Sequence, residues 1–477
     1  MQRDLILSLN IYKFNSGENG YFMLSIFVNA IKVKDVRNKV LFTLGIIALC
    51  RIMANIPTPG VDTKALNIYF QQFGATSGAG MFFGMFDMFT GGALEKFAIA
   101  TLGIMPYISA AIIMQMLQPV VPQFEKMVRE GGESGRQKFN QYTRYLTLII
   151  CIIQGAMAAY AMEFPQRIGL PAPTQALVTN PGPSFVIMTI IILTSGSMFL
   201  MWLGEKITEN GVGNGASLII TVGILSRIPN AIYSLYEMMK SGGLNGETIR
   251  PVHLLLLILL FIFVTAATVI LTKGHRRVPI QHAKRMVGRR MSGGSNYIPL
   301  LVNFSGVMPI ILAGAILIVP DMVFQWIPSL RFMSAYFVYG GLWYMVVYAI
   351  LIFAFSYFWV ANQFNPMQMA DGLKRDSAFI PGIKPGTPTA SYLDDVMTKI
   401  TLGGAAYLLA LAVFPMILST HFGIPFLVGS FFGGTSLLIM VGVALDTMNQ
   451  LESHLVMRNY DGFLKKAKIG RSRRIGL

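Results

Sequence analysis

Apolar residues of this chain gather into ten long runs, and short polar or glycine-rich stretches separate them. Each run is close to the roughly 20 residues that an α-helix needs to cross a bilayer. Buried helices of a soluble protein are a poor alternative, because the stretches between the runs hold too few polar residues to cover them. The pattern predicts an all-α polytopic membrane protein with ten transmembrane helices. We place them near residues 40–56, 97–119, 143–162, 184–204, 215–233, 252–272, 301–319, 340–361, 397–416 and 434–451.

Composition agrees with this pattern. The chain has 477 residues, of which 54% are hydrophobic and 13% are charged. A soluble domain usually carries about 25% charged residues, so the apolar surface of this protein is expected to face lipid. The net charge of +16 would favour nucleic-acid binding in a soluble protein. Here the cations collect in a few loops, and their position matters more than their number.

Positive charge alternates between the two ends of the predicted helices. Residues 272–299 carry seven Lys or Arg and no Asp or Glu, and the tail after Glu452 carries another seven cations. The third-to-fourth loop has only Arg167 and the seventh-to-eighth loop only Arg331. The positive-inside rule then predicts that both termini and the even-numbered loops are cytoplasmic.

The ends of the chain differ from the apolar body. We expect residues 1–22 to be an N-terminal extension, because they are mixed and unpatterned. Residues 23–39 alternate apolar and basic side chains, which predicts an amphipathic segment on the inner membrane face. Residues 453–477 form a basic cytoplasmic tail.

A repeated sequence motif, called here the echo, predicts that the helical part of the chain consists of two pseudo-symmetric halves of five helices each. GIMPYI (103–108) in the second predicted helix matches GVMPII (306–311) in the seventh, which holds the equivalent position in the back half. The predicted halves are 40–233 and 252–452, joined by an outer hinge loop at 234–251. Repeats of this kind often place the working pathway between the halves.

Ionisable residues within predicted spans are the default functional candidates. Arg51 lies in the first span and is interpreted as a structural anchor or a snorkelling residue. Glu205 and Asp446 lie near the inner ends of the fourth and tenth spans, where water can reach them. We find no paired carboxylates, His pair or Ser/Lys dyad in mid-membrane, so an enzyme or a proton-coupled transporter is not expected.

Cofactor sites are not expected either. The glycine-containing stretches lack the lysine and hydroxyl of a P-loop, so nucleotide binding is unsupported. Cys50 and Cys151 lie in apolar runs without metal-ligand spacing, and we interpret them as buried small residues. We expect no cofactor and no metal, and energy from a partner or from the membrane potential.

The first-to-second connection is unusually apolar for a loop. Residues 72–92 mix glycines with Met and Phe side chains. One interpretation is a re-entrant or interfacial packing segment. The other is a short movable helix that fills a cavity, because flexible Met and bulky Phe suit a reversible apolar seal.

Six stretches of the chain carry distinctive motifs: TLGIMPYISAAII (101–113), GESGRQKFNQYTRYLT (132–147), MWLGEKITENGVGNG (201–215), GVMPIILA (306–313), FIPGIKPGTPTASYLD (379–394) and GGTSLLIMVGVALD (433–446). In this order they resemble the SecY family of protein-conducting channels, and the likeness runs from about Met23 to the tail.

The resemblance implies the central subunit of a Sec channel in the bacterial cytoplasmic membrane. Such a channel passes unfolded secretory proteins across the membrane, and releases transmembrane segments into lipid through a lateral gate. The gate would lie between the second-to-third and seventh-to-eighth helices. A ring of aliphatic side chains and a plug, here within 72–92, would close the channel. The implied ring is Ile104, Ile108, Ala216, Ile220, Ile311 and Ile439, and the plug includes Phe86 and Phe89.

The resemblance also implies partners. These are SecE-like and SecG-like subunits, a SecA-like motor ATPase, the ribosome, and signal sequences and nascent chains. The cytoplasmic loops 273–297 and 362–396 would dock the ribosome or the motor, whose phosphates or acidic surfaces attract basic loops. The docking residues would be Arg276, Arg277, Lys284, Arg285, Arg289, Arg290, Lys374, Arg375 and Lys384.

Two residues depart from the family pattern. Ala216 stands where a bulky aliphatic residue is usual, which predicts a wider ring or one completed by a neighbour. Lys384 stands where arginine is usual, and a lysine offers a point charge instead of a planar fork.

Other interpretations stay open at the level of sequence. A secondary transporter would share the repeat and the broken helices, but it predicts buried polar substrate ligands that we do not find. Any single isoleucine of the ring could face lipid or pack in a core, and the basic loops could serve topology alone.

Overall fold

The computed structural model is mostly helical in the part of the chain that it describes. That part comprises residues 33–74, 84, 86–168, 173, 175–241, 251–282, 285–287, 290–292, 295–314, 316–317, 340–422, 429 and 435–472. The predicted extension 1–22 and most of the segment 23–39 lie outside it. The helices are α3 (Lys34–Met53), α4 (Thr63–Gly74), α6 (Met105–Leu117), α7 (Pro122–Glu130), α8 (Gly132–Glu163), η1 (Pro165–Ile168), α9 (Pro183–Asn210), α10 (Gly215–Ser226), α11 (Ile228–Ser241), α12 (Pro251–Lys273), α15 (Leu342–Gln363), α16 (Pro366–Arg375), α17 (Thr387–Phe422) and α19 (Thr435–Ser472).

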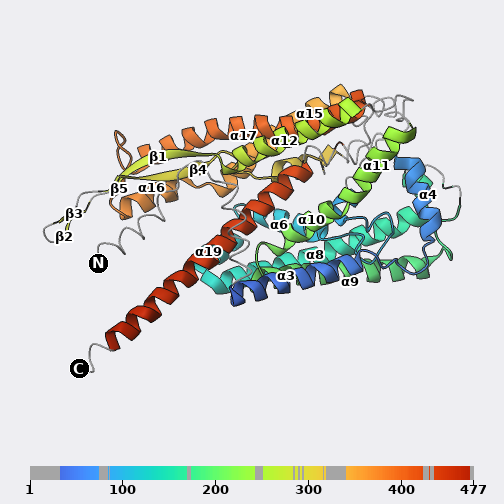
Figure 1. The fold of residues 1–477 in the computed structure, drawn as a ribbon, viewed down its shortest axis with the longest axis horizontal. Coiled ribbons are helices and arrows are strands. Elements are labelled where there is room, and N and C mark those ends of the chain that lie inside the picture. The colour runs from blue at the N-terminus through green and yellow to red at the C-terminus, as the bar shows by residue number, and fades with distance from the viewer. Residues whose placement is uncertain are drawn as a thin grey trace.

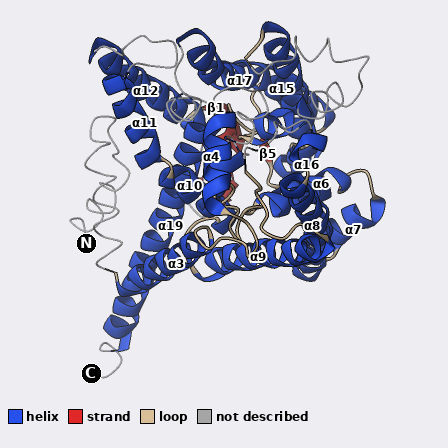
Figure 2. Ribbon diagram, turned by 90° about the vertical axis from the view of Figure 1, so that its right-hand side faces the viewer, coloured by secondary structure: helices blue, strands red, loops and turns tan. Residues whose placement is uncertain are grey.

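The long helices run roughly side by side in two groups (Figure 1). Seen along the long axis, α12, α15 and α17 lie on one side of the molecule, and α3, α8 and α9 lie on the other (Figure 2). Between the groups stand α6 at one edge and α10 with α19 at the other. The far end of α19 projects well beyond the bundle.

Five described helical stretches are long and apolar enough to cross a membrane: Gly132–Glu163, Pro183–Asn210, Gly215–Tyr236, Leu342–Arg375 and Thr387–Ile417. They overlap the third, fourth, fifth, eighth and ninth predicted spans. Two shorter apolar helices, Met105–Leu117 and Leu257–Lys273, fall within the second and sixth. The prediction of a helical, multi-span protein is therefore confirmed in this coarser form.

Several observed helices extend beyond the predicted spans, and two predicted spans contain a break that the sequence did not reveal. The second span was predicted from residue 97, but α6 begins at Met105, because turns occupy residues 99–104 and Gly103 has φ +58°. The fifth span is interrupted at Arg227, where α10 ends and α11 begins. Hydrophobicity alone detects neither break, since apolar turns and apolar helices have the same composition.

The two echo stretches share one local conformation. Gly103 and Gly306 both have positive φ, +58° and +62°. In each stretch a proline three residues later, Pro106 or Pro309, lies in the first turn of the helix that follows. Proline is tolerated there because its missing N–H would have no helical partner. Both prolines therefore lie at the start of a helix and not in its interior.

A small sheet adds strands to the predicted all-α fold. β1 (His275–His282) pairs antiparallel with β4 (Ser295–Leu301), and β5 (Ala378–Phe379) pairs with the end of β1. β2 (Arg285–Val287) pairs with β3 (Arg290–Ser292). The alternation of buried Val278 and Ile280 with exposed neighbours is the strand signal that the sequence analysis overlooked.

Buried apolar side chains form two main clusters between the helices. The first, called here the waist cluster, draws on residues from Ile46 to Ile224 together with Trp359, Ile439 and Val443. The second is built from Val264 to Leu438. A separate cluster packs the β1–β4 hairpin against α15 and α17.

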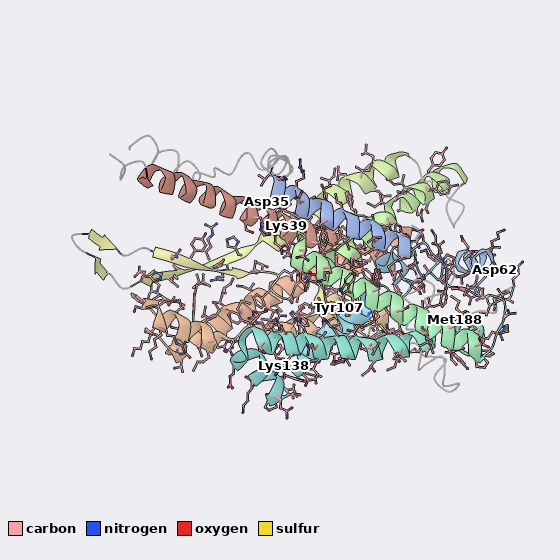
Figure 3. The ribbon with its side chains drawn as sticks, turned by 90° about the horizontal axis from the view of Figure 1, so that it is seen from below. Asp35, Lys39, Asp62, Tyr107, Lys138 and Met188 are labelled. Atoms are coloured by element: carbon pink, nitrogen blue, oxygen red, sulfur yellow. The ribbon has the colours of Figure 1, made fainter. Side chains whose placement is uncertain are left out.

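Labelled residues near the helix ends lie at different positions along the long axis of the molecule. Lys39, near the start of α3, and Lys138, near the start of α8, lie toward the end that carries the hairpin (Figure 3). Asp62 lies at the opposite end, beside α4. The hairpin and the amino ends of these two helices thus share one side of the molecule.

Candidate functional site

The waist cluster brings together side chains from helices far apart in sequence. Ile104 and Ile108 come from the start of α6, Ile220 from α10 and Ile439 from α19, and all four are at most 9% exposed. Trp359 of α15 packs into the same cluster. The described side chains therefore fill the place where the two helix groups meet.

The two remaining ring positions behave differently. Ala216 is partly buried and packs against the waist cluster. Ile311 is half-buried and belongs to neither main cluster, whereas its neighbour Ile310 is buried in the second one. From the same stretch Val307, Met308 and Leu312 reach the waist cluster. Five of the six predicted ring positions thus share one cluster, and Ile311 lies beside it.

The structure describes mainly the second part of the predicted plug. Residues 75–83 and 85 lie outside the described residues, and residues 86–90 are helical. Met88 and Phe89 are 2% and 9% exposed and belong to the waist cluster, while Phe86 is half-buried. The hydroxyl of Ser436, at the start of α19, lies 3.4 Å from the Met88 sulfur. This part of the predicted plug therefore packs against predicted ring residues.

A set of charges, of which Arg227 and Asp87 are buried, adjoins the same segment. Arg227 forms an ion pair with Asp87, and its Nη2 lies 2.7 Å from a Glu95 carboxylate oxygen. Arg51 Nη1 donates to the Gly91 carbonyl at 3.2 Å and to the Ser226 hydroxyl at 2.8 Å. Arg51 is thus the structural anchor that was one of its two interpretations.

Sequence reasoning missed the partner of this anchor. Arg227 lies inside the fifth predicted span, and an arginine at that place is itself a signal of function. Arg227 and Asp87 are each 8% exposed. Burial raises the pKa of the Glu95 carboxyl, and the positive charge of the neighbouring Lys96 opposes that effect.

Of the other two ionisable candidates, one is paired with an arginine and the other is exposed. Glu205 of α9 makes a bidentate pair with Arg144 of α8, at 2.9 and 2.7 Å. Asp446 is exposed. The sequence analysis placed both near water.

A hydrogen bond joins α15 to α6 beside the waist cluster. Asn362 Nδ2, in the last turn of α15, donates to the Gln115 carbonyl of α6 at 3.2 Å. Trp359 lies one turn earlier on the same helix and packs into the waist cluster. One edge of α15 therefore faces the front half of the chain.

The predicted docking cations converge on the small sheet. Arg276 and Arg277 are exposed on β1, and the Arg277 guanidinium lies 4.9 Å from the centre of the Tyr297 ring on β4. Lys374 and Arg375, exposed at the end of α16, precede β5, which pairs with β1. The remaining docking residues divide as follows: Lys384 is exposed in the loop after β5, Arg285 and Arg290 lie on β2 and β3, and Lys284 and Arg289 fall outside the described residues.

Metal ligands do not gather in the described part of the chain. No group of three or more His, Cys, Asp or Glu side chains there could hold a metal ion. Cys50 and Cys151 are free and buried.

Comparison with known proteins decides the family. The SecY family model matches residues 98–448. The chain belongs to the SecY family. The protein translocase subunit SecY of Chlamydia muridarum is 39% identical over 443 residues, covering 91% of this chain and 96% of that protein.

Two solved structures show the same fold. One was solved in a study of how the SecY plug domain stabilises the closed state of the translocation channel and maintains a membrane seal. It matches with a TM-score of 0.56 at 20% identity, covering 88% of this chain and 92% of that one. The other is the channel of a canine ribosome–channel complex from the endoplasmic reticulum, with a TM-score of 0.52 at 18% identity and the same coverage.

Proposed function

We propose that this chain is the protein-conducting subunit of a Sec translocase in a bacterial cytoplasmic membrane. Unfolded secretory proteins pass between its two helix groups, and membrane segments leave sideways into lipid. The observation that carries the proposal is the waist cluster, in which isoleucines of α6, α10 and α19 meet the second part of the predicted plug. Family membership supports the same function.

The proposed topology has ten spans in two halves, 40–233 and 252–452, with both termini cytoplasmic. The shared conformation of Gly103–Pro106 and Gly306–Pro309 supports the repeat. The position of Lys39 and Lys138 on the hairpin side supports a common cytoplasmic face. Residues 234–251 then join the halves on the outer side.

The ring works by excluding water. Isoleucine side chains offer an ion nothing to replace its hydration shell, and narrow apolar constrictions gate by dewetting. An extended polypeptide meets no hydrogen-bonding side chain among them, so its passage depends little on sequence. The ring comprises Ile104, Ile108, Ile220 and Ile439 with Ala216, and Ile311 stands at its margin.

The small side chain of Ala216 is compensated within the waist cluster. Leu218 also packs against the cluster, and Met88 and Phe89 are buried in it. We infer that these side chains supply the bulk missing at Ala216, so that the resting seal depends on residues 86–90.

The lateral gate lies between α6 and α15. The hydrogen bond from Asn362 to Gln115 and the packing of Trp359 hold these helices together in the resting state. Both contacts must break for a transmembrane segment to leave between them.

Partner proteins supply the energy for transport and stabilise the channel. We infer SecE-like and SecG-like subunits, a SecA-like motor ATPase, and a ribosome that delivers nascent chains with their signal sequences. The canine relative in fold is itself part of a ribosome complex. The basic surface around β1, α16 and β5 is the docking site, because exposed cations of two loops meet there.

Reversing Arg276, Arg277, Arg289 and Arg290 to glutamate is expected to weaken ribosome binding by about tenfold or more at physiological salt, because phosphate contacts dominate such binding. The loss should shrink as salt rises, since screening weakens the wild-type contacts as well. Co-sedimentation with ribosomes over a salt series measures it. Cysteine accessibility must show unchanged topology, and normal binding by correctly inserted protein would leave the loop a topological role alone.

Disulfide trapping tests the pathway directly. In a chain with Cys50→Ala and Cys151→Ala, single cysteines replace Ile108, Ile220 or Ile439, and an arrested secretory precursor carries one cysteine. We expect oxidation to link the precursor to each of the three positions. Ile191 of α9, 62% exposed on the outside of the bundle, is the matched control and should not be linked. Equal linkage at Ile191, or none at the ring, would contradict the proposal.

A further inference from the structure

The last part of the predicted plug, residues 86–92, is held by two arginines from elsewhere in the chain. Arg51 comes from α3, and Arg227 comes from the junction of α10 and α11. Asp87 and Glu95 supply the opposing charges, and the Glu95 N–H donates to Asp87 Oδ1 at 2.9 Å. We call Arg51, Arg227, Asp87 and Glu95 the root clamp.

The turn inside the clamp has no room for side chains. Gly91 and Gly92 have φ of +69° and +90°. A Cβ on Gly91 would lie 2.8 Å from the Cα of Gly223, and one on Gly92 would lie 3.2 Å from Arg227 Cζ. A Cβ on Gly223 would in turn lie 2.6 Å from the Phe89 carbonyl oxygen. The turn therefore packs backbone against backbone on α10.

Position along the chain links the clamp to the seal. Asp87 directly precedes Met88 and Phe89, and Gly91 follows two residues later. Both ends of this short stretch are therefore tied to Arg227 and Arg51, while its two apolar side chains pack in the waist cluster. A shift of the clamp would move the side chains that cover the ring.

The root clamp contains two positive and two negative charges, so the loss of any one of them disturbs its charge balance. Arg51 lies near enough to Arg227 for the two positive charges to repel, and the two carboxylates offset that repulsion. Removing one member leaves a charge of the clamp only partly compensated, which is unfavourable at a buried site. Within the described residues, the Nε atoms of both arginines are buried without a hydrogen-bond acceptor, so the closed arrangement is not fully satisfied.

We propose that Arg227 and Arg51 are positioning residues, which set the stability of the closed channel by holding Met88 and Phe89 against the ring through Asp87 and Gly91. The proposal rests on the channel function proposed above. It adds an electrostatic control of closure, in which the ion pairs of Arg227 determine how readily the segment leaves the waist cluster. A merely structural clamp would affect assembly and leave conductance unchanged.

The test is a mutant cycle on the reconstituted complex of this chain with its SecE-like subunit. Asp87→Asn and Arg227→Gln are each expected to raise resting ion conductance several-fold and to relax signal-sequence selection. The double variant should show less than the sum of the two effects, because the pair is then removed as a unit. Arg144→Gln is the matched control, since it breaks another interhelical arginine–carboxylate pair away from the plug, and its conductance should stay at the wild-type level.

Assembly is measured in parallel by size-exclusion chromatography. If a single variant fails to assemble, Asp87→Leu with Arg227→Met replaces the pair by apolar side chains, which buried sites often tolerate. Wild-type conductance in assembled variants of this pair would overturn the proposal. Precursor translocation by the wild-type complex is scored separately, so that a failed clamp is distinguished from a failed channel assignment.

Discussion

Replacing Ile108 or Ile439 with asparagine will raise the ion conductance of the resting channel several-fold and will permit export of precursors with defective signal sequences. Both side chains are less than a tenth exposed and lie in the waist cluster. An amide buried there without a partner costs about 1–3 kcal/mol, and admitting water relieves that cost. Water that persists at the constriction gives ions a path.

Controls separate a pore effect from general damage. Ile191→Asn places the same amide on an exposed face of α9, where it should affect insertion or stability without changing conductance. Ile311→Asn should raise conductance less than the other two, because Ile311 lies outside the cluster. Single-channel recording with protein level and assembly measured alongside decides the matter. Stable Ile108 and Ile439 variants with normal conductance would remove these residues from the ring.

Deleting residues 72–90 will open the resting channel further than any point change, and it will also lower the thermal stability of the complex. The deletion removes Met88 and Phe89 from the waist cluster. Losing buried side chains of this size costs about 2–5 kcal/mol each when the cavity does not collapse. It also removes Asp87, which leaves Arg227 with Glu95 as its counter-charge.

A shorter deletion separates the two effects. Removing residues 72–84 spares Asp87, Met88 and Phe89, so the root clamp and its packing remain. We expect this variant to keep near-normal thermal stability and to leak less than the longer deletion. Conductance and melting temperature of both purified complexes measure the difference. Identical wild-type conductance in the two deletions would show that no part of this segment seals the channel.

The fold class could be predicted from sequence because the bilayer imposes a strong rule. Backbone polar groups must be satisfied within each span, so long apolar runs become helices. The third, fourth, fifth, eighth and ninth runs match helices that are long and apolar enough to span. Boundaries were less predictable: α6 begins at Met105 because Gly103 takes a left-handed conformation that hydrophobicity cannot reveal.

The structure brings together most of the positions that were predicted to form the ring. Family resemblance and the GIMPYI/GVMPII echo pointed to six positions, and the structure gathers five of them. Ile311 differs because the start of its helix turns Ile310 toward the second cluster instead. The stretch as a whole reaches the waist, but through Val307, Met308 and Leu312.

The root clamp could not be predicted, because its members are far apart in sequence. Arg51 and Arg227 are separated by more than a hundred residues, and each alone is an isolated charge in an apolar run. Their common target, the Gly91–Gly92 turn, ends the apolar stretch 72–92, whose sequence does not indicate two arginine partners. Only the fold brings the charges together. The sequence also gives no sign that Phe97 adopts a positive φ of +44° in a tight turn.

Protease protection of a secretory precursor in proteoliposomes tests the central claim most directly. The vesicles contain this chain with its SecE-like subunit, and a SecA-like motor, ATP and an unfolded precursor are added outside. The account predicts precursor protected inside the vesicles, in proportion to the complex and dependent on ATP, and absent from vesicles lacking this chain. A correctly assembled complex that protects no precursor under these conditions, while the vesicles take up a small solute, would contradict it.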